Sequence, residues 1–177
     1  TYITQKRFLE KDGKGILALD DLYIGNKTVI EGHFSLPVGY PTYTSKESFE
    51  SFYPFVPYQF EFIKNVLKGF RSREYTTVKD SERSILRIAY NSANTTANKE
   101  LGNVVPFDMM LTALGVLAHN GNVAIQMPRA VAKTYSDPDF ANRVVNALFM
   151  LCHMTENDKN QLPASVETLT TLLITKI

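Results

Sequence analysis

The sequence has little of what a secreted or membrane-embedded protein usually carries. Its single cysteine, Cys152, excludes an internal disulfide and is typical of a reducing compartment. No apolar run approaches the roughly 20 residues that a transmembrane helix needs, and no signal peptide opens the chain. The formal net charge is only +1, so composition alone gives no overall attraction to nucleic acid or to an anionic membrane. We therefore predict a cytoplasmic protein without a membrane partner.

Recognisable catalytic and metal-binding motifs are also missing. A phosphate-binding loop needs a glycine five residues before Gly-Lys-Ser/Thr, but Gly13-Lys14 is followed by Gly15 and has Phe8 at that earlier position. The three histidines lack the paired spacing of a zinc site: His33, His119 and His153. A capped turn is the simpler role for His119. We expect no catalytic residue, metal ion or cofactor to be held by this chain alone.

What the sequence does contain is a series of amphipathic patterns, which predict a mainly α protein built as a multi-helix bundle. We expect two short helices within residues 3–23, broken at 12–15, then mostly loop over 26–43 with a short strand at 28–33. The remaining expected helices cover 44–52, 57–70, 81–93, 140–151 and 163–173, and one that starts at 106 and ends at 119–121, with a connection at 128–139 and a polar turn at 156–161. The helical pattern continues to the last residues.

The apolar positions of these helices predict which side chains are buried. The stripe of the helix that begins near Asp80 or Ser81 comprises Ile85, Leu86, Ala89, Tyr90 and Ala93. Cys152 lies in an apolar run, so a buried structural thiol is the favoured interpretation over a nucleophile.

Six aromatic side chains are concentrated between residues 51 and 62, around Pro54 and Pro57. The prolines stiffen the approach to a helix, and each ring can bury about 150–250 Å² against neighbouring elements. We interpret the cluster as a structural anchor for the helices around it. The alternative is base stacking on Phe52, Tyr53 or Tyr58.

Two sets of basic residues are candidate phosphate contacts. Arg83 and Arg87 lie one turn apart on the same expected helix, with Arg83 in its first turn, where a guanidinium can meet a phosphate bidentately across an interface. From the sequence alone, the favoured interpretation is a pair of surface arginines that bond to Glu82 or Asp80. A second set is a candidate nucleic-acid patch: Lys64, Lys68, Arg71 and Arg73.

Four segments, in order and at similar spacing, resemble the BrxC family of P-loop proteins from bacterial BREX phage-defence systems and the related PglY proteins. Residues 53–60 resemble the family's YPF-PYQF signature, 81–86 its GERS-L segment and 104–107 its LVPF segment. Residues 147–149 with 169–173 are similar to its LLFLIRY…NIATLM region. Ser81 stands where the family has a glycine, and the chain diverges after Phe107.

This resemblance implies a helical region C-terminal to the nucleotide-binding core of a large AAA+ ATPase. The chain opens with Thr1 rather than methionine, so we expect an excised part of that protein. Residues 1–43 would supply N-terminal helices and a loop, 44–127 a lid-like domain, and 128–177 a linker and the start of a winged-helix-like module.

The same resemblance implies roles and partners. Arg83 and Arg87 would take a sensor-like position near the nucleotide, whose ATP and Mg²⁺ bind in the parent protein rather than in this chain. The expected partners are the rest of the ATPase, other BREX components, DNA, and further copies joined through the parent. Two other interpretations stay open: a helical nucleic-acid-binding module, and a protein-interaction scaffold.

Overall fold

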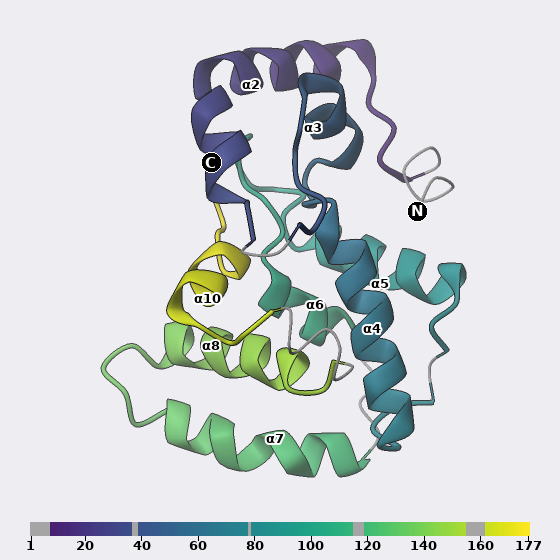
Figure 1. The fold of residues 1–177 in the computed structure, drawn as a ribbon, viewed down its shortest axis with the longest axis vertical. Coiled ribbons are helices and arrows are strands. Elements are labelled where there is room, and N and C mark those ends of the chain that lie inside the picture. Colours follow the sequence, from purple (N-terminus) through teal and green to yellow (C-terminus); the bar gives the residue numbers. More distant parts are fainter. Residues whose placement is uncertain (1–7, 37–38, 78, 115–118, 155–161) are drawn as a thin grey trace.

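The protein is described by a computed structural model that covers residues 8–36, 39–77, 79–114, 119–154 and 162–177. Within these residues the chain forms eight helices and no strand (Figure 1), which confirms the prediction of a mainly α protein. In the described part, no helix combines the length and the apolarity that crossing a bilayer requires. The polar turn expected at 156–161 lies outside the described residues, as does the side chain of His119.

The first described helix, α2 (Gly13–His33), is much longer than the sequence pattern predicts. The prediction of a loop from residue 26 and of a strand at 28–33 is wrong, because the chain stays helical as far as His33. Tyr23 and Ile30 are buried on one side of this helix, which packs against α3. The helix kinks at Asn26, with φ −131° and ψ 20°, and the Asn26 amide donates to the backbone oxygen of Leu22 at 3.0 Å. That hydrogen bond supports the backbone where the helix bends.

The expected break at 12–15 is the start of α2 rather than a gap between two short helices. The Asp12 side chain accepts a hydrogen bond from the Gly15 backbone at 2.7 Å and so caps the helix. Residues 1–7, which would hold most of the first expected helix, lie outside the described residues.

Helix α3 (Lys46–Phe52) is held against α2 by charged side chains as well as by packing. Lys46 Nζ lies 3.0 Å from Asp20 Oδ2 and 3.6 Å from Glu50 Oε1. A hydrogen bond between the two carboxyl groups lowers the pKa of Asp20 and raises that of Glu50. The proximity of the two acids therefore moves their pKa values in opposite directions.

Serine side chains cap the starts of three helices, in two cases at positions that differ from the prediction. Ser45 caps α3, which the sequence pattern started at residue 44, and Ser165 caps α10 (Val166–Leu172), which the pattern started at Pro163. Ser81 caps α5 (Glu82–Asn94) as expected. In each case the hydroxyl accepts from the backbone N–H three residues later.

Helix α4 (Tyr58–Ser72) runs through the core and follows Pro57 as the sequence predicts. Its buried residues include five large apolar side chains: Phe60, Phe62, Ile63, Leu67 and Phe70. Helix α5 packs beside it, on the outer side in Figure 1. The expected burial of Tyr90 on α5 is wrong, because Ile88, Ala89 and Ser92 form the buried side and leave the Tyr90 ring 53% exposed.

Helices α6 (Phe107–Leu114), α7 (His119–Ala132) and α8 (Pro138–Leu151) form the lower part of the molecule. The sequence pattern ends a helix at 119–121 and places a connection at 128–139, but α7 begins at His119 and continues through Pro128. Ile125 and Ala132, one seven-residue repeat apart, are buried, and α7 packs on α8, which compensates for the missing N–H of the proline. The predicted domain boundary at 127/128 therefore falls inside a helix.

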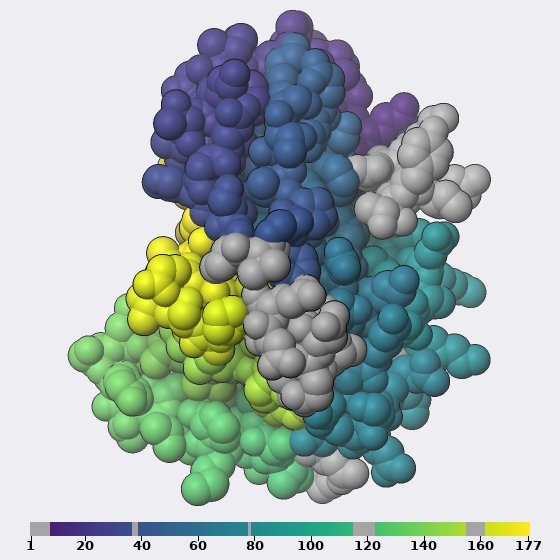
Figure 2. Space-filling model, in the orientation of Figure 1, coloured from purple at the N-terminus to yellow at the C-terminus, as the bar shows by residue number. Residues whose placement is uncertain are grey.

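The end of the chain is extended rather than helical, contrary to the pattern of its last residues. Val104 N donates to Thr175 O at 3.0 Å, and Ile177 N donates to Gly102 O at 2.9 Å, on either side of an antiparallel bridge between Asn103 and Lys176. Figure 2 shows this C-terminal part (yellow) between the N-terminal helices and the α7–α8 hairpin (green).

Cys152 is exposed, so the prediction of a buried thiol is wrong. The residue is the C-cap of α8, and its Sγ lies 3.3 Å from the backbone oxygen of Phe149. Its neighbours Leu151 and Met154 take the buried positions. The apolar run around the cysteine thus predicts the helix correctly, but it does not predict that Cys152 faces solvent.

Candidate functional site

The aromatic cluster of residues 51–62 lies mostly inside the protein, as an anchor requires. The Phe62 ring contacts those of Tyr40, Tyr58 and Phe107, with centroids 4.8, 5.2 and 5.6 Å apart. Tyr58 is only 1% exposed, and burial raises the pKa of its hydroxyl. A ring in that position has no face for a nucleic-acid base, which excludes Tyr58 from the stacking alternative.

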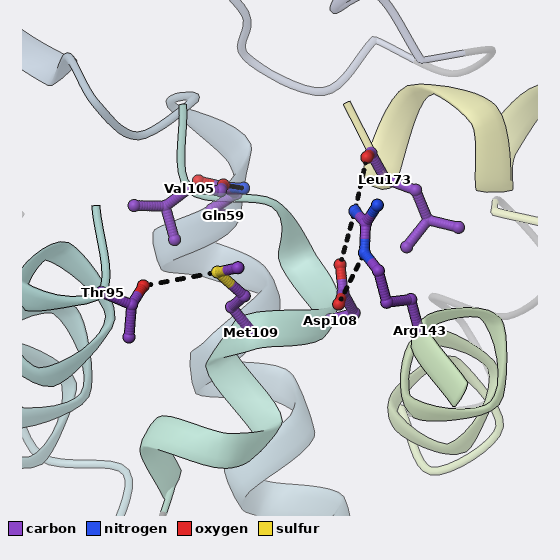
Figure 3. A network of polar contacts seen from close by, with 7 residues as sticks. All are labelled: Gln59, Thr95, Val105, Asp108, Met109, Arg143 and Leu173. Carbon is purple, nitrogen blue, oxygen red and sulfur yellow. Dashed lines mark hydrogen bonds and ion pairs between the residues drawn. The ribbon is translucent and has the colours of Figure 1, made fainter. Parts of the chain in front are cut away.

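Gln59 is a buried polar residue that the sequence analysis did not single out. Its Oε1 accepts from Val56 N at 3.0 Å and its Nε2 donates to Val105 O at 2.8 Å (Figure 3). Val105 N in turn donates to Pro54 O at 2.9 Å. The aromatic segment and the segment before α6 are therefore tied together by hydrogen bonds inside the core.

A buried ion pair continues this polar network. Arg143 on α8 holds Asp108 on α6 bidentately, at 3.1 and 3.2 Å, and donates to Leu173 O at 2.7 Å (Figure 3). Asp108 is only 3% exposed, and burial raises the pKa of its carboxyl group although the bonds from Arg143 oppose that rise. Because desolvation offsets much of the attraction, we interpret the pair as fixing how α6, α8 and the end of α10 fit together.

The basic residues predicted on α4 are only partly brought together. Lys64, Lys68 and Arg71 share one exposed face of the helix. Arg73 lies beyond the end of α4, and its guanidinium donates to Gly69 O at 3.1 Å. Arg71 Nη1 lies 3.4 Å from Asp80 Oδ1, so this cation already has an acidic partner.

A groove of about 550 Å³ between α4 and the start of α5 carries charges of both signs. Lys64 and Lys68 line it, together with three acidic residues: Glu61, Asp80 and Glu82. The acids reduce the positive potential that a phosphate-binding surface would need.

The two arginines on α5 differ from Arg71 on α4, which is paired with Asp80. Arg83 and Arg87 are exposed, and the described residues contain no ion pair with either of them. The expected alternative, in which they bond to Glu82 or Asp80, is not what the structure shows, since Asp80 pairs with Arg71.

Arg83 and Arg87 belong to a longer exposed row on α5. At 100° per residue, Arg83, Arg87, Tyr90 and Asn94 project within about 60° of one another, and all four are exposed. We call this row the α5 stripe. The sequence pattern does not identify its two later members, because it places Tyr90 on the buried side and ends the helix at residue 93.

The α5 stripe ends at a cleft of about 480 Å³. Asn94 and Lys99 line this cleft, together with Tyr53 and Phe8. The Phe8 ring also meets Tyr90 edge to face, with centroids 5.7 Å apart. Exposed cations, an exposed ring and a cleft with amide groups therefore occur side by side on this part of the surface.

Comparison with known proteins adds neither a family nor a fold to these observations. No family model matches the chain. No solved structure matches it either. Among the residues that the structure describes, no group of three or more His, Cys, Asp or Glu side chains could hold a metal ion. Function must therefore be argued from the residues and their geometry.

Proposed function

We propose that this chain is a non-catalytic helical region of a bacterial BREX-type P-loop ATPase of the AAA+ kind. It would couple the nucleotide state to assembly or remodelling in phage defence, with a lid-like part followed by the start of a winged-helix-like module. ATP and Mg²⁺ would bind to the core of the parent protein. The partners would be the rest of that ATPase, further copies of it and other BREX components.

The observation that carries this proposal is the way three of the four segments that resemble the family meet in space. Residues 53–60 and 104–107 are joined by the hydrogen bonds of Gln59 and Val105. Asp108 directly follows the third segment, and Arg143 connects it to Leu173, at the end of the fourth. The segments that resemble the family thus hold neighbouring helices together. This arrangement is expected of a non-catalytic helical region whose helices must keep a fixed orientation.

The position of Arg83 supports the sensor-like role that the resemblance implies. Arg83 lies in the first turn of α5, is exposed and has no acidic partner among the described residues. A fixed cation facing the γ-phosphate would interact more strongly as negative charge develops there, and would link nucleotide state to lid position.

The test is Arg83→Ala in the parent ATPase. Because a phosphate-facing arginine stabilises the transition state, we expect kcat for ATP hydrolysis to fall by about tenfold or more. Lys27→Ala, which removes an exposed cation of α2, is the matched control and should leave kcat unchanged. Equal turnover of both variants would remove the sensor-like role.

A second measurement tests the non-catalytic assignment itself. The purified chain of 177 residues should release no phosphate from ATP in the presence of Mg²⁺ above the background of heat-denatured protein. Phosphate release that depends on the folded chain would contradict the proposal.

A further inference from the structure

We propose that the α5 stripe binds single-stranded nucleic acid, with Arg83 and Arg87 on the phosphates and Tyr90 stacked on a base. This inference does not depend on the parent ATPase. Sequence-tolerant binding of single strands combines cations that follow the backbone with aromatic rings on which bases stack. Both components are present on one side of α5.

The charge along this part of the chain is of one sign. No acidic residue occurs between Arg83 and Lys99, the next basic residue after Arg87. Since neither arginine has an acidic partner among the described residues, neither must break an ion pair to reach a phosphate. On α4, by contrast, phosphate would compete with Asp80 for Arg71 and would approach Glu61 in the groove.

Tyr90 provides the stacking surface. The residue is 53% exposed although it belongs to a folded helix, and the edge-to-face contact with Phe8 restrains its ring. A restrained ring loses little conformational freedom when a base stacks on it. Arg87 lies one turn away on the same face, so a phosphate bound there and a base on Tyr90 can belong to neighbouring nucleotides.

The cleft beyond the stripe offers a place for the next base. Asn94 is about 17 Å along the helix axis from Arg83, and it lines the cleft with Lys99. Amide groups can bond to the exposed edges of unpaired bases. Two acids also line the cleft, Glu10 and Glu100, and the carboxylate of Glu100 is paired with Lys176 at 3.0 Å.

The geometry favours a single strand over a duplex. In a duplex the bases are already stacked on one another, and Tyr90 would have no base face to meet. Two arginines also neutralise too few phosphates to hold a duplex by charge alone. Because of the Tyr90 ring, the α5 stripe should bind unpaired nucleotides more tightly than a duplex.

The first test uses the purified full chain and a fluorescently labelled single-stranded oligonucleotide of mixed sequence, with binding followed by fluorescence anisotropy at several salt concentrations. The double variant Arg83→Gln/Arg87→Gln should bind at least about tenfold more weakly at low salt. The slope of log K against log salt should become shallower by about 1.4, because two phosphate contacts are lost.

Matched variants separate the stripe from general basic charge. Lys64→Gln/Lys68→Gln removes the same number of charges from α4, and we expect less than a twofold loss of affinity. Tyr90→Ala should weaken binding by about tenfold. Tyr90→Phe, which keeps the ring, should bind like the unaltered chain. Far-ultraviolet circular dichroism and a thermal melt should show that every variant is folded.

Several outcomes would overturn the inference. These are no binding at low salt, an equal loss in the α4 control, full affinity of folded Tyr90→Ala, or equal affinity for a duplex of the same sequence. Failure here leaves the sensor-like role of Arg83 intact, because that role is measured by ATP turnover of the parent protein. Conversely, normal ATP turnover of an Arg83→Ala parent would remove the sensor-like role without contradicting the strand-binding inference.

Discussion

Helices α4 and α5 lie side by side and both carry basic residues, yet they use them differently. Nine of the fifteen residues of α4 are buried, and its exposed cations share a groove with acids. On α5 only three of thirteen residues are buried, and the two arginines face solvent without an acidic partner in the described part of the chain. The ability of a helix to bind phosphate therefore depends less on its number of basic residues than on the charge of the residues next to them.

The largest effect expected from this difference is on the buried side of α4. In Gly69→Ala, the added methyl group would overlap the backbone carbonyl of His153, so the two segments could not keep their distance. We expect a loss of about 3 kcal/mol or more of unfolding free energy in urea titrations. Gly25→Ala on α2 is the control, because nothing lies near the added methyl group. Equal stability of the two variants would contradict the tight packing of α4.

A smaller loss of unfolding free energy is expected when Gln59, the buried polar residue of α4, is replaced. Gln59→Leu would leave Val56 N–H and Val105 C=O buried without their present partner, which costs about 2–4 kcal/mol. Urea unfolding of this variant should be compared with that of Asn91→Leu, which replaces an exposed amide of α5. If both variants lose the same unfolding free energy, the buried hydrogen bonds of Gln59 contribute no more to stability than an exposed amide does.

The start of each helix gives a third contrast. Helix α4 has no side-chain cap, whereas Ser81 caps α5. Ser81→Ala should cost about 1 kcal/mol, because one backbone N–H loses its acceptor. The thermal midpoint of this variant should fall as far as that of Ser45→Ala, which removes the same kind of cap from α3. No change for Ser81→Ala would show that α5 is held by packing alone, as α4 is.

The smallest effect on stability is expected at the α5 stripe. Arg83→Gln and Arg87→Gln should each change the unfolding free energy by less than about 0.5 kcal/mol, because neither side chain has an ionic partner within the part of the chain that the structure describes. A larger loss in urea titration would mean that the arginines serve the fold, and it would weaken the contrast with α4.

Much of the helical core could be predicted from the sequence. The spacing of Phe60, Ile63, Val66, Leu67 and Phe70 predicts the buried side of α4, and the structure confirms it. Ser81 as a cap followed from residue type and position. These features are local, so propensity and periodicity are sufficient to identify them.

The misses come from contacts between distant residues. Asn26 and Pro128 are ordinary signals for a loop, but packing of α2 on α3 and of α7 on α8 keeps both regions helical. Gln59 and Arg143 donate hydrogen bonds to residues 46 and 30 positions away in the sequence. No local sequence pattern predicts such long-range pairs. Tyr90 and Cys152 have apolar neighbours in sequence, yet each lies on the outer side of its helix.

The bridge between Asn103 and Lys176 has a consequence for folding. It closes a long loop of chain that contains α6, α7, α8 and α10, and the entropy lost in that closure must be recovered by contacts that form together. This half of the molecule should therefore open cooperatively. The amide protons of Val104 and Ile177, which bond across the closure, should show the same protection factor in hydrogen exchange.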